Sequence, residues 1–223
     1  MVDVLPAPRP VLVAFVVAAV LNLVSVTADV RWLEIVTKPL LCGLLLGWAW
    51  LACDRSPPAA LMAGLVAALA GDELLGPDGS VWFVAGMGAF LVMQVCYVVG
   101  FVRLGAADRL RERRGVIAAW ALLWLVLNVV LGPSLGVLQV PIAVYSAALT
   151  TMAACAVATG DRRVGVGGVL FLVSDTLIGL GAADVHVPAS GFLVMSTYAL
   201  AQLLIVTGWV LLVREPARSR ATA

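Results

Sequence analysis

Residues 81–102 read VWFVAGMGAFLVMQVCYVVGFV and contain no charged side chain. A helix needs roughly 20 such residues to cross the hydrocarbon core of a bilayer. Similar apolar runs, separated by short polar breaks, follow one another along a chain that is 63% hydrophobic and 12% charged. Lipid is therefore the expected main solvent. We predict an all-α fold, a polytopic membrane bundle of about eight transmembrane helices that form a single domain over residues 1–223.

Glycine, proline and charged residues mark the breaks between the predicted spans. Transmembrane β-strands would alternate polar and apolar residues, whereas these runs are apolar on all sides. The first run is interpreted as a retained helix, with signal-peptide cleavage near Ala28 as the alternative. The predicted spans are 11–27, 36–53, 58–76, 81–102, 115–132, 136–158, 164–182 and 189–213.

Lysine and arginine are distributed unevenly between the two sets of loops. The loops after the third, fifth and seventh spans have neither residue, and the loop after the first has Arg31 beside Asp29 and Glu34. Because cytoplasmic loops carry the excess of basic residues, we predict a multi-pass protein of the cell membrane with both termini in the cytoplasm. The predicted cytoplasmic residues are Arg9, Arg55, Arg103, Arg109, Arg111, Arg113, Arg114, Arg162, Arg163, Arg214, Arg218 and Arg220.

The net charge of +1 gives no reason to expect a nucleic-acid partner. The four cysteines, Cys42, Cys53, Cys96 and Cys155, lie in apolar stretches without CxxC spacing and are expected to have no function. Histidine and cysteine do not cluster with metal-ligand spacing, so we expect no bound metal. Helix faces rich in Ala, Gly and Ser allow close packing within one chain or between chains, so the sequence leaves the oligomeric state open.

A short internal similarity suggests a duplication. Residues 71–76, GDELLG, end the third span, and residues 174–179, SDTLIG, lie in the seventh. The fourth and eighth spans also resemble each other, with Gln94 and Tyr97 in one and Tyr198 and Gln202 in the other. These similarities suggest two parallel four-helix halves.

The few ionisable residues inside the predicted spans share the outer side of the membrane. Asp72 and Glu73 lie about one turn from the outer end of the third span, and Asp175 lies about two turns inside the seventh. Such groups are costly in hydrocarbon and usually face a cavity or a partner. We predict Asp72 and Asp175 as a catalytic pair, one protonated and one ionised and able to orient water. Alternatively, each pairs with Lys38 or caps a helix end.

Seven further polar side chains are predicted to line the same outward-facing pocket and to bind substrate. The single lysine, Lys38, either contacts an anionic phosphate or a carboxylate there, or snorkels to the interface. The tyrosines lie too deep for an interfacial belt, so they are expected to form hydrogen bonds into the cavity. Five tryptophans are interpreted as interface anchors or lipid-facing bulk, namely Trp32, Trp82, Trp120, Trp124 and Trp209. The seven are Lys38, Asn128 and Tyr145 in the outer half and Gln94, Tyr97, Tyr198 and Gln202 near mid-depth.

At these residues the chain resembles the YhhN-like lysoplasmalogenase family of integral membrane proteins. The motifs are TKPLL at 37–41, GD at 71–72 with following leucines, FL at 90–91 through Tyr97, SD at 174–175 and YALAQ at 198–202. They spread over nearly the whole chain, and their order and spacing carry the resemblance. Where the family pattern has a histidine, this chain has Gln94, so no imidazole can act at that position.

The resemblance implies hydrolysis of the vinyl ether bond of a lysoplasmalogen to a fatty aldehyde and a glycerophospho-base. The partners would be this lysophospholipid and membrane lipids, and no cofactor is implied. Protonation of the outer alkene carbon gives an oxocarbenium ion, water captures it, and the hemiacetal collapses, a sequence that two carboxyls can support without metal. Either Asp72 or Asp175 would be the acid, with Lys38 near the phosphate and Tyr145 or Tyr198 orienting the head group.

Two other functions are weighed against this one. Buried carboxylates also relay protons in transporters or other lipid-handling proteins, but the internal similarity here is parallel and the predicted helices are continuous. Hydrolysis of an ester or amide by a serine nucleophile is disfavoured, because Ser174 beside Asp175 lacks a GxSxG turn and a partner histidine.

Overall fold

The computed structural model describes residues 9–77 and 79–221, with side chains described as far as Arg214. Within these residues every regular element is helical, which confirms the all-α prediction. The helices are α1 (Arg9–Thr27), α2 (Arg31–Ala52), α3 (Ala59–Leu74), α4 (Ser80–Arg103), α5 (Ala106–Glu112), α6 (Arg114–Leu131), α7 (Gln139–Ala158), α8 (Arg162–Ala182) and α9 (Ser190–Ala221), and two short 3₁₀ turns, η1 (Gly132–Ser134) and η2 (Gly136–Leu138), join α6 to α7.

Seven of these helices are long and apolar enough to cross a membrane, which confirms a multi-pass membrane protein. They are α1, α2, α4, α6, α7, α8 and α9. Helix α3, with 16 residues, is shorter than the roughly 20 that cross the core at right angles. A count of eight spans therefore stays a prediction.

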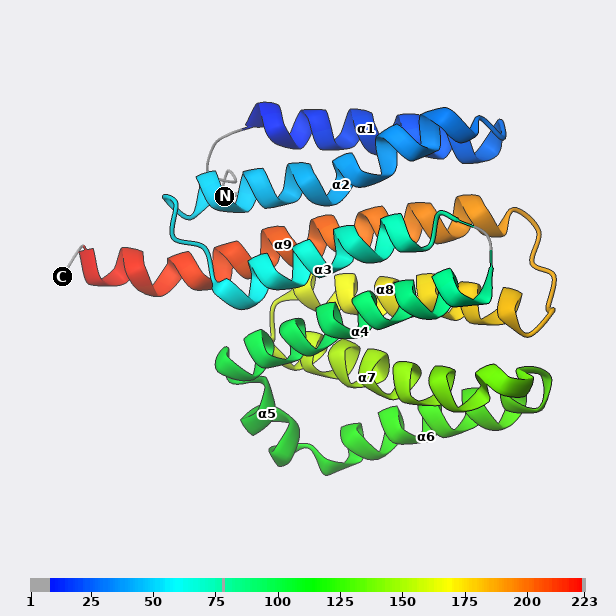
Figure 1. Ribbon diagram of the computed structural model, residues 1–223. Coiled ribbons are helices and arrows are strands. Elements are labelled where there is room, and N and C mark those ends of the chain that lie inside the picture. The colour runs from blue at the N-terminus through cyan, green and yellow to red at the C-terminus, as the bar shows by residue number, and fades with distance from the viewer. Residues whose placement is uncertain (1–8, 78, 222–223) are drawn as a thin grey trace.

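The long helices run side by side and alternate in direction, so their connections gather at two ends of the bundle (Figure 1). The α1–α2, α3–α4, α6–α7 and α8–α9 connections lie at one end. Arg55, Arg103, the α5 region and Arg162 belong to the opposite end. The bundle thus has an arginine-rich end and an arginine-poor end, as expected from basic loops that alternate with uncharged ones along the sequence.

Two boundaries differ from the predicted ones. Helix α2 begins at Arg31, five residues before the predicted start of 36, so Pro39 lies inside the helix and not in its first turn. The helix bends near this position in Figure 1, because proline removes one backbone hydrogen bond and clashes with the preceding turn. The segment between 102 and 115, expected as a loop, contains α5.

Two arginines at the arginine-rich end cap the C-termini of neighbouring helices. Arg109 on α5 donates to the carbonyl oxygens of Ala158, at 3.1 Å, and Thr159, at the end of α7. Arg214 on α9 donates to the carbonyl of Ala52 at the end of α2. Basic side chains at helix C-termini satisfy free carbonyls and complement the helix dipole. These residues therefore stabilise the bundle in addition to marking its side.

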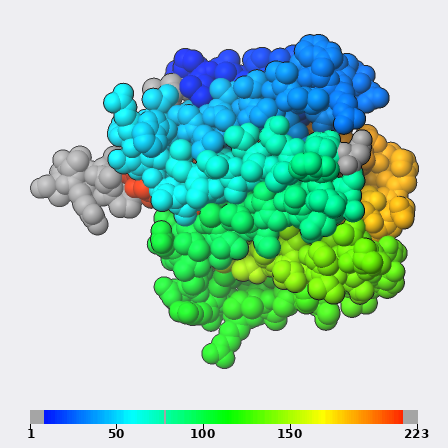
Figure 2. All heavy atoms as spheres, in the orientation of Figure 1, coloured from blue at the N-terminus to red at the C-terminus, as the bar shows by residue number. Residues whose placement is uncertain are grey.

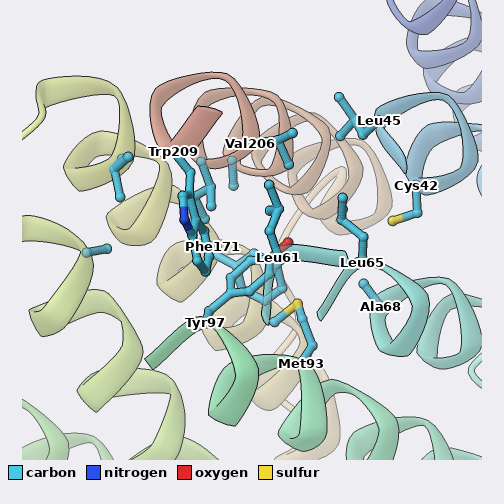
Figure 3. Packing of buried hydrophobic residues seen from close by; sticks show 14 of the residues in the cluster. Cys42, Leu45, Leu61, Leu65, Ala68, Met93, Tyr97, Phe171, Val206 and Trp209 are labelled. Atoms are coloured by element: carbon cyan, nitrogen blue, oxygen red, sulfur yellow. The ribbon is translucent and has the colours of Figure 1, made fainter. Parts of the chain in front are cut away.

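The core runs between α2, α3, α4, α7, α8 and α9. In the space-filling view, the α1–α2 pair, α3 and α4 and the α5–α7 region follow one another across the visible face as one continuous body (Figure 2). Beneath this face the rings of Tyr97, Phe171 and Trp209 gather between the helices (Figure 3). The Phe101 and Trp209 ring centroids are 4.9 Å apart.

The prediction that Trp209 faces lipid or the interface is wrong. Its side chain is 1% exposed and packs against Tyr97 and Phe101. A Cβ atom on Gly100 would lie 1.9 Å from the indole of Trp209, so this ring occupies space that only a glycine leaves free. On helix α9, Tyr198 and Gln202 lie on the same face as Trp209, and this spacing was the available signal for its burial.

The most extensive helix contacts are those of α3 with α4 and of α8 with α9. In each case the preceding helix also packs against the pair, α2 against α3 and α7 against α8. This order is compatible with two parallel halves. The duplication itself stays a prediction.

Candidate active site

A cavity opens among α2, α3, α4 and α6–α9, on the side of the arginine-poor connections. Its space not filled by atoms, the open mouth included, is about 1000 Å³. Most of the lining is apolar, with contributions from Phe83, Met87 and Phe90 of α4 and from Leu172 and Ile178 of α8. The polar side chains of the cavity therefore stand out against hydrocarbon-like walls. Six of the nine predicted site residues line it, namely Lys38, Asp72, Asn128, Tyr145, Asp175 and Tyr198.

Asp72 lies in the last turn of α3 and is 3% exposed. The hydroxyl of Tyr198, on α9, donates to its Oδ2 at 2.6 Å. The preceding Gly71 lets α4 approach, since a Cβ there would lie 2.7 Å from the ring of Phe90. Glu73, which points away on the next helical position, is exposed and does not line the cavity.

Asp175 lies on α8 and is partly exposed to the cavity. The hydroxyl of Tyr145, on α7, donates to its Oδ2. The neighbouring Ser174 is buried and donates to the carbonyl of Val194 on α9 at 3.1 Å. The Ser174 hydroxyl thus joins α8 to α9 and holds the wall on which Asp175 sits.

Lys38 and Asn128 complete the polar lining. Lys38, half-buried on α2, forms no ion pair within 4.0 Å with any carboxylate that the structure describes, and so its ammonium group is available to an anionic ligand. Asn128, on α6, donates to the carbonyl of Trp124 at 2.8 Å and to the hydroxyl of Ser146 on α7 at 3.1 Å.

The remaining three predicted residues lie outside the cavity lining. Tyr97 is fully buried and donates to the side-chain oxygen of Gln202 at 2.9 Å, and so ties α4 to α9 within the core. Gln94 is also fully buried, and neither its amide nitrogen nor its oxygen has a hydrogen-bond partner among the described residues. This placement gives no support to direct substrate contact by these residues, which stays a prediction.

Cys42, which was expected from the sequence to have no function, contacts Asp72 and Tyr198. Its sulfur, directed from α2 into the bundle (Figure 3), lies 3.2 Å from the Tyr198 hydroxyl and 3.7 Å from Asp72 Oδ2. The Tyr198 hydroxyl donates its proton to Asp72, and the Cys42 thiol, which has a single proton, also donates to Asp72 and so only contacts the Tyr198 oxygen. The available signal was spacing, since Cys42 follows Lys38 by one helical turn and so shares its side of α2.

Two carboxyls, each holding a tyrosine hydroxyl, thus face one apolar cavity with an unpaired ammonium at its wall. Each carboxyl keeps its second oxygen, Oδ1, free of the tyrosine contact and available to a ligand. Among the described residues no three His, Cys, Asp or Glu side chains are grouped to hold a metal ion. The arrangement is suited to acid–base chemistry on a long apolar molecule with an anionic group.

The YhhN family model matches residues 33–209, a segment that contains every residue lining this cavity. The chain belongs to the YhhN family. Two curated members of similar sequence are named lysoplasmalogenase, one from Mycobacterium bovis and one from Mycobacterium tuberculosis. Each is 32% identical to this YhhN-family chain over 155 residues, which cover 67% of this chain and 59% of the relative. The chain therefore spans about three fifths of the length of these relatives. No solved structure gives a significant match.

Proposed function

We propose that this chain is a membrane-embedded hydrolase of lysoplasmalogens, which it cleaves at the vinyl ether bond to a fatty aldehyde and a glycerophospho-base. The observation that carries the proposal is the pair of aspartates that line one apolar cavity from α3 and α8, each fixed by a tyrosine hydroxyl. The similarity to proteins named lysoplasmalogenase supports the choice of substrate.

The reaction begins with transfer of a proton from a carboxylic acid to the outer carbon of the alkene. The adjacent carbon and the ether oxygen then share a positive charge, which the second, ionised carboxylate stabilises. Water adds to that carbon and gives up a proton to the carboxylate, and the hemiacetal collapses to the aldehyde and the free glycerol hydroxyl. In this collapse the first carboxylate takes the proton of the hemiacetal hydroxyl and the second carboxyl protonates the departing glycerol oxygen, so one water is consumed and both carboxyls return to their starting states.

The hydrogen bonds suggest a role for each aspartate. Asp72 accepts from two donors, Tyr198 and Cys42, and hydrogen bonds to the charged form of a carboxyl favour that form. Asp175 accepts from Tyr145 alone among the described groups and is partly exposed to the cavity. We therefore assign Asp175 as the proton donor and Asp72 as the carboxylate that stabilises the cation and orients water.

Lys38 is assigned to the phosphate of the head group. It lines the cavity without an ion pair to a described carboxylate, and an ammonium group binds phosphate as a point charge. Lys38 lies about two turns inside the arginine-poor end of α2, as Asp175 does on α8, so the head group and the vinyl ether would lie at similar depth below the cavity mouth. The proposed orientation puts this mouth on the outer side of the membrane and both termini in the cytoplasm.

Replacement of each aspartate tests the assignment. Asp72→Asn and Asp175→Asn keep the side-chain shape and remove the titratable proton, so aldehyde release by purified protein should fall by about 10²–10⁴-fold in each variant. The matched control is Glu73→Gln, which changes an adjacent exposed carboxyl outside the cavity and should keep wild-type activity. Retained activity in both aspartate variants, with thermal unfolding like that of wild type, would refute the carboxyl pair.

A further inference from the structure

A second hollow lies between α5, α6 and α7, at the edge of the bundle. Its space not filled by atoms, its open side included, is about 720 Å³. The residues that bound it include Ile117, Trp120 and Trp124 on α6 and Ala147, Thr151 and Ala154 on α7, and no charged side chain contributes. Such a lining suits a hydrocarbon chain and offers little to a polar ligand. We call this hollow the α6–α7 groove.

The groove adjoins the candidate active-site cavity. Thr150 on α7 lines both of them. On α6, Trp124 is the last residue that lines the groove. Asn128 and Leu131, which follow on the same helical face, line the cavity. One face of α6 therefore borders both spaces. The groove lies on the part of this face that is nearer the arginine-rich end.

The junction between the two spaces is held by hydrogen bonds. The indole nitrogen of Trp124 donates to the carbonyl of Ala143 at 3.2 Å and to the hydroxyl of Ser146 at 3.1 Å. Asn128 donates to the same Ser146 hydroxyl. These bonds fix the indole on α6 against α7, so the wall at the junction has a defined shape.

Helix α6 has no buried residue, which leaves the groove open at the edge of the bundle. A lipid in the bilayer can thus reach the groove from the side. A lysolipid whose phosphate lies at Lys38 and whose vinyl ether lies between the aspartates can extend its remaining chain along α6 and α7 into the groove.

We propose that the α6–α7 groove receives the distal part of the single hydrocarbon chain of the substrate and so determines which chain lengths are cleaved. The inference rests on the proposed function, which supplies the substrate. It goes beyond it by assigning chain recognition to residues of α6 and α7 that take no part in the chemistry.

The test fills the groove and measures selectivity. Ala121→Phe and Ala147→Phe each place a ring in the groove, and Ala121→Leu is a milder filler in case the larger ring prevents folding. The control, Ala119→Phe, adds the same ring to α6 at an exposed position that lines neither space. The substrates are 1-alkenyl lysolipids with one head group and increasing chain length, assayed with the purified full chain in detergent.

The fillers should lower kcat/KM for the longest chains by roughly four-fold for each methylene that the groove no longer buries. The shortest chain should be cleaved within about two-fold of wild type, as expected when the chemistry is intact. The Ala119→Phe variant should keep the wild-type profile.

Equal loss for all chain lengths, or no change in the profile, would overturn the assignment and indicate that a bilayer lipid or nothing occupies the groove. Absence of aldehyde from wild type with every chain would instead overturn the proposed function, so the two failures are distinguishable.

Discussion

Tyr198 and Tyr145 each donate their one hydroxyl proton to an aspartate, yet their surroundings differ. Tyr198 is 4% exposed and has Cys42 behind it, whereas Tyr145 is half-buried at the cavity wall. The Cys42 thiol therefore positions Tyr198 and Asp72 from outside the cavity. It does not itself line the space where a substrate would bind.

Cys42→Ala should lower kcat by about five-fold, because a lost hydrogen bond near a reacting group corresponds to about 1 kcal/mol. Cys42→Ser, which keeps a donor, should restore most of the rate. The matched control is Cys155→Ala, which removes a buried thiol on α7 outside the cavity lining and should leave kcat unchanged. Equal losses in Cys42→Ala and Cys155→Ala would show that the Cys42 contact has no catalytic consequence.

Depth along the helices was predictable from the sequence, but helix rotation was so only in part. The order of polar breaks gave each long helix and placed Asp72, Asp175, Lys38 and Tyr145 near one end, where they do line one cavity. Which residues of an all-apolar helix face inward is not encoded in a polar stripe. Spacing from Lys38 and from Gln202 indicates the helical faces of Cys42 and Trp209, but only the structure shows that these side chains contact Asp72 and the core rings.

The packing of α4 against α9 depends on a glycine. Gly100→Ala would put a Cβ within 1.9 Å of the Trp209 ring, and overpacking of this kind costs about 1–3 kcal/mol of stability. We expect a lower thermal unfolding midpoint in detergent. Gly88→Ala, on the same helix, meets no atom within 4 Å and should be neutral or stabilising, because alanine favours helix by about 1 kcal/mol. A midpoint for Gly100→Ala equal to that of Gly88→Ala would contradict the close α4–α9 approach.

At the scale of the whole molecule, the two ends of the bundle differ in charge, and this asymmetry predicts orientation. Single cysteines can be introduced at the exposed positions Ser56, at the arginine-rich end, and His186, at the other, after replacement of the four native cysteines. In intact cells a membrane-impermeant thiol reagent should label His186→Cys. It should label Ser56→Cys only after permeabilisation, and the opposite pattern would reverse the topology.

We propose that the cavity protonates a vinyl ether on carbon. We would incubate the purified wild-type chain in D₂O with a lysoplasmalogen and, in parallel, with an ester-linked lysophospholipid of the same head group and chain length. The account predicts aldehyde from the vinyl ether alone, with deuterium on the carbon next to the carbonyl, and no fatty acid from the ester. Fatty acid from the ester, or no aldehyde from a folded protein, would contradict it.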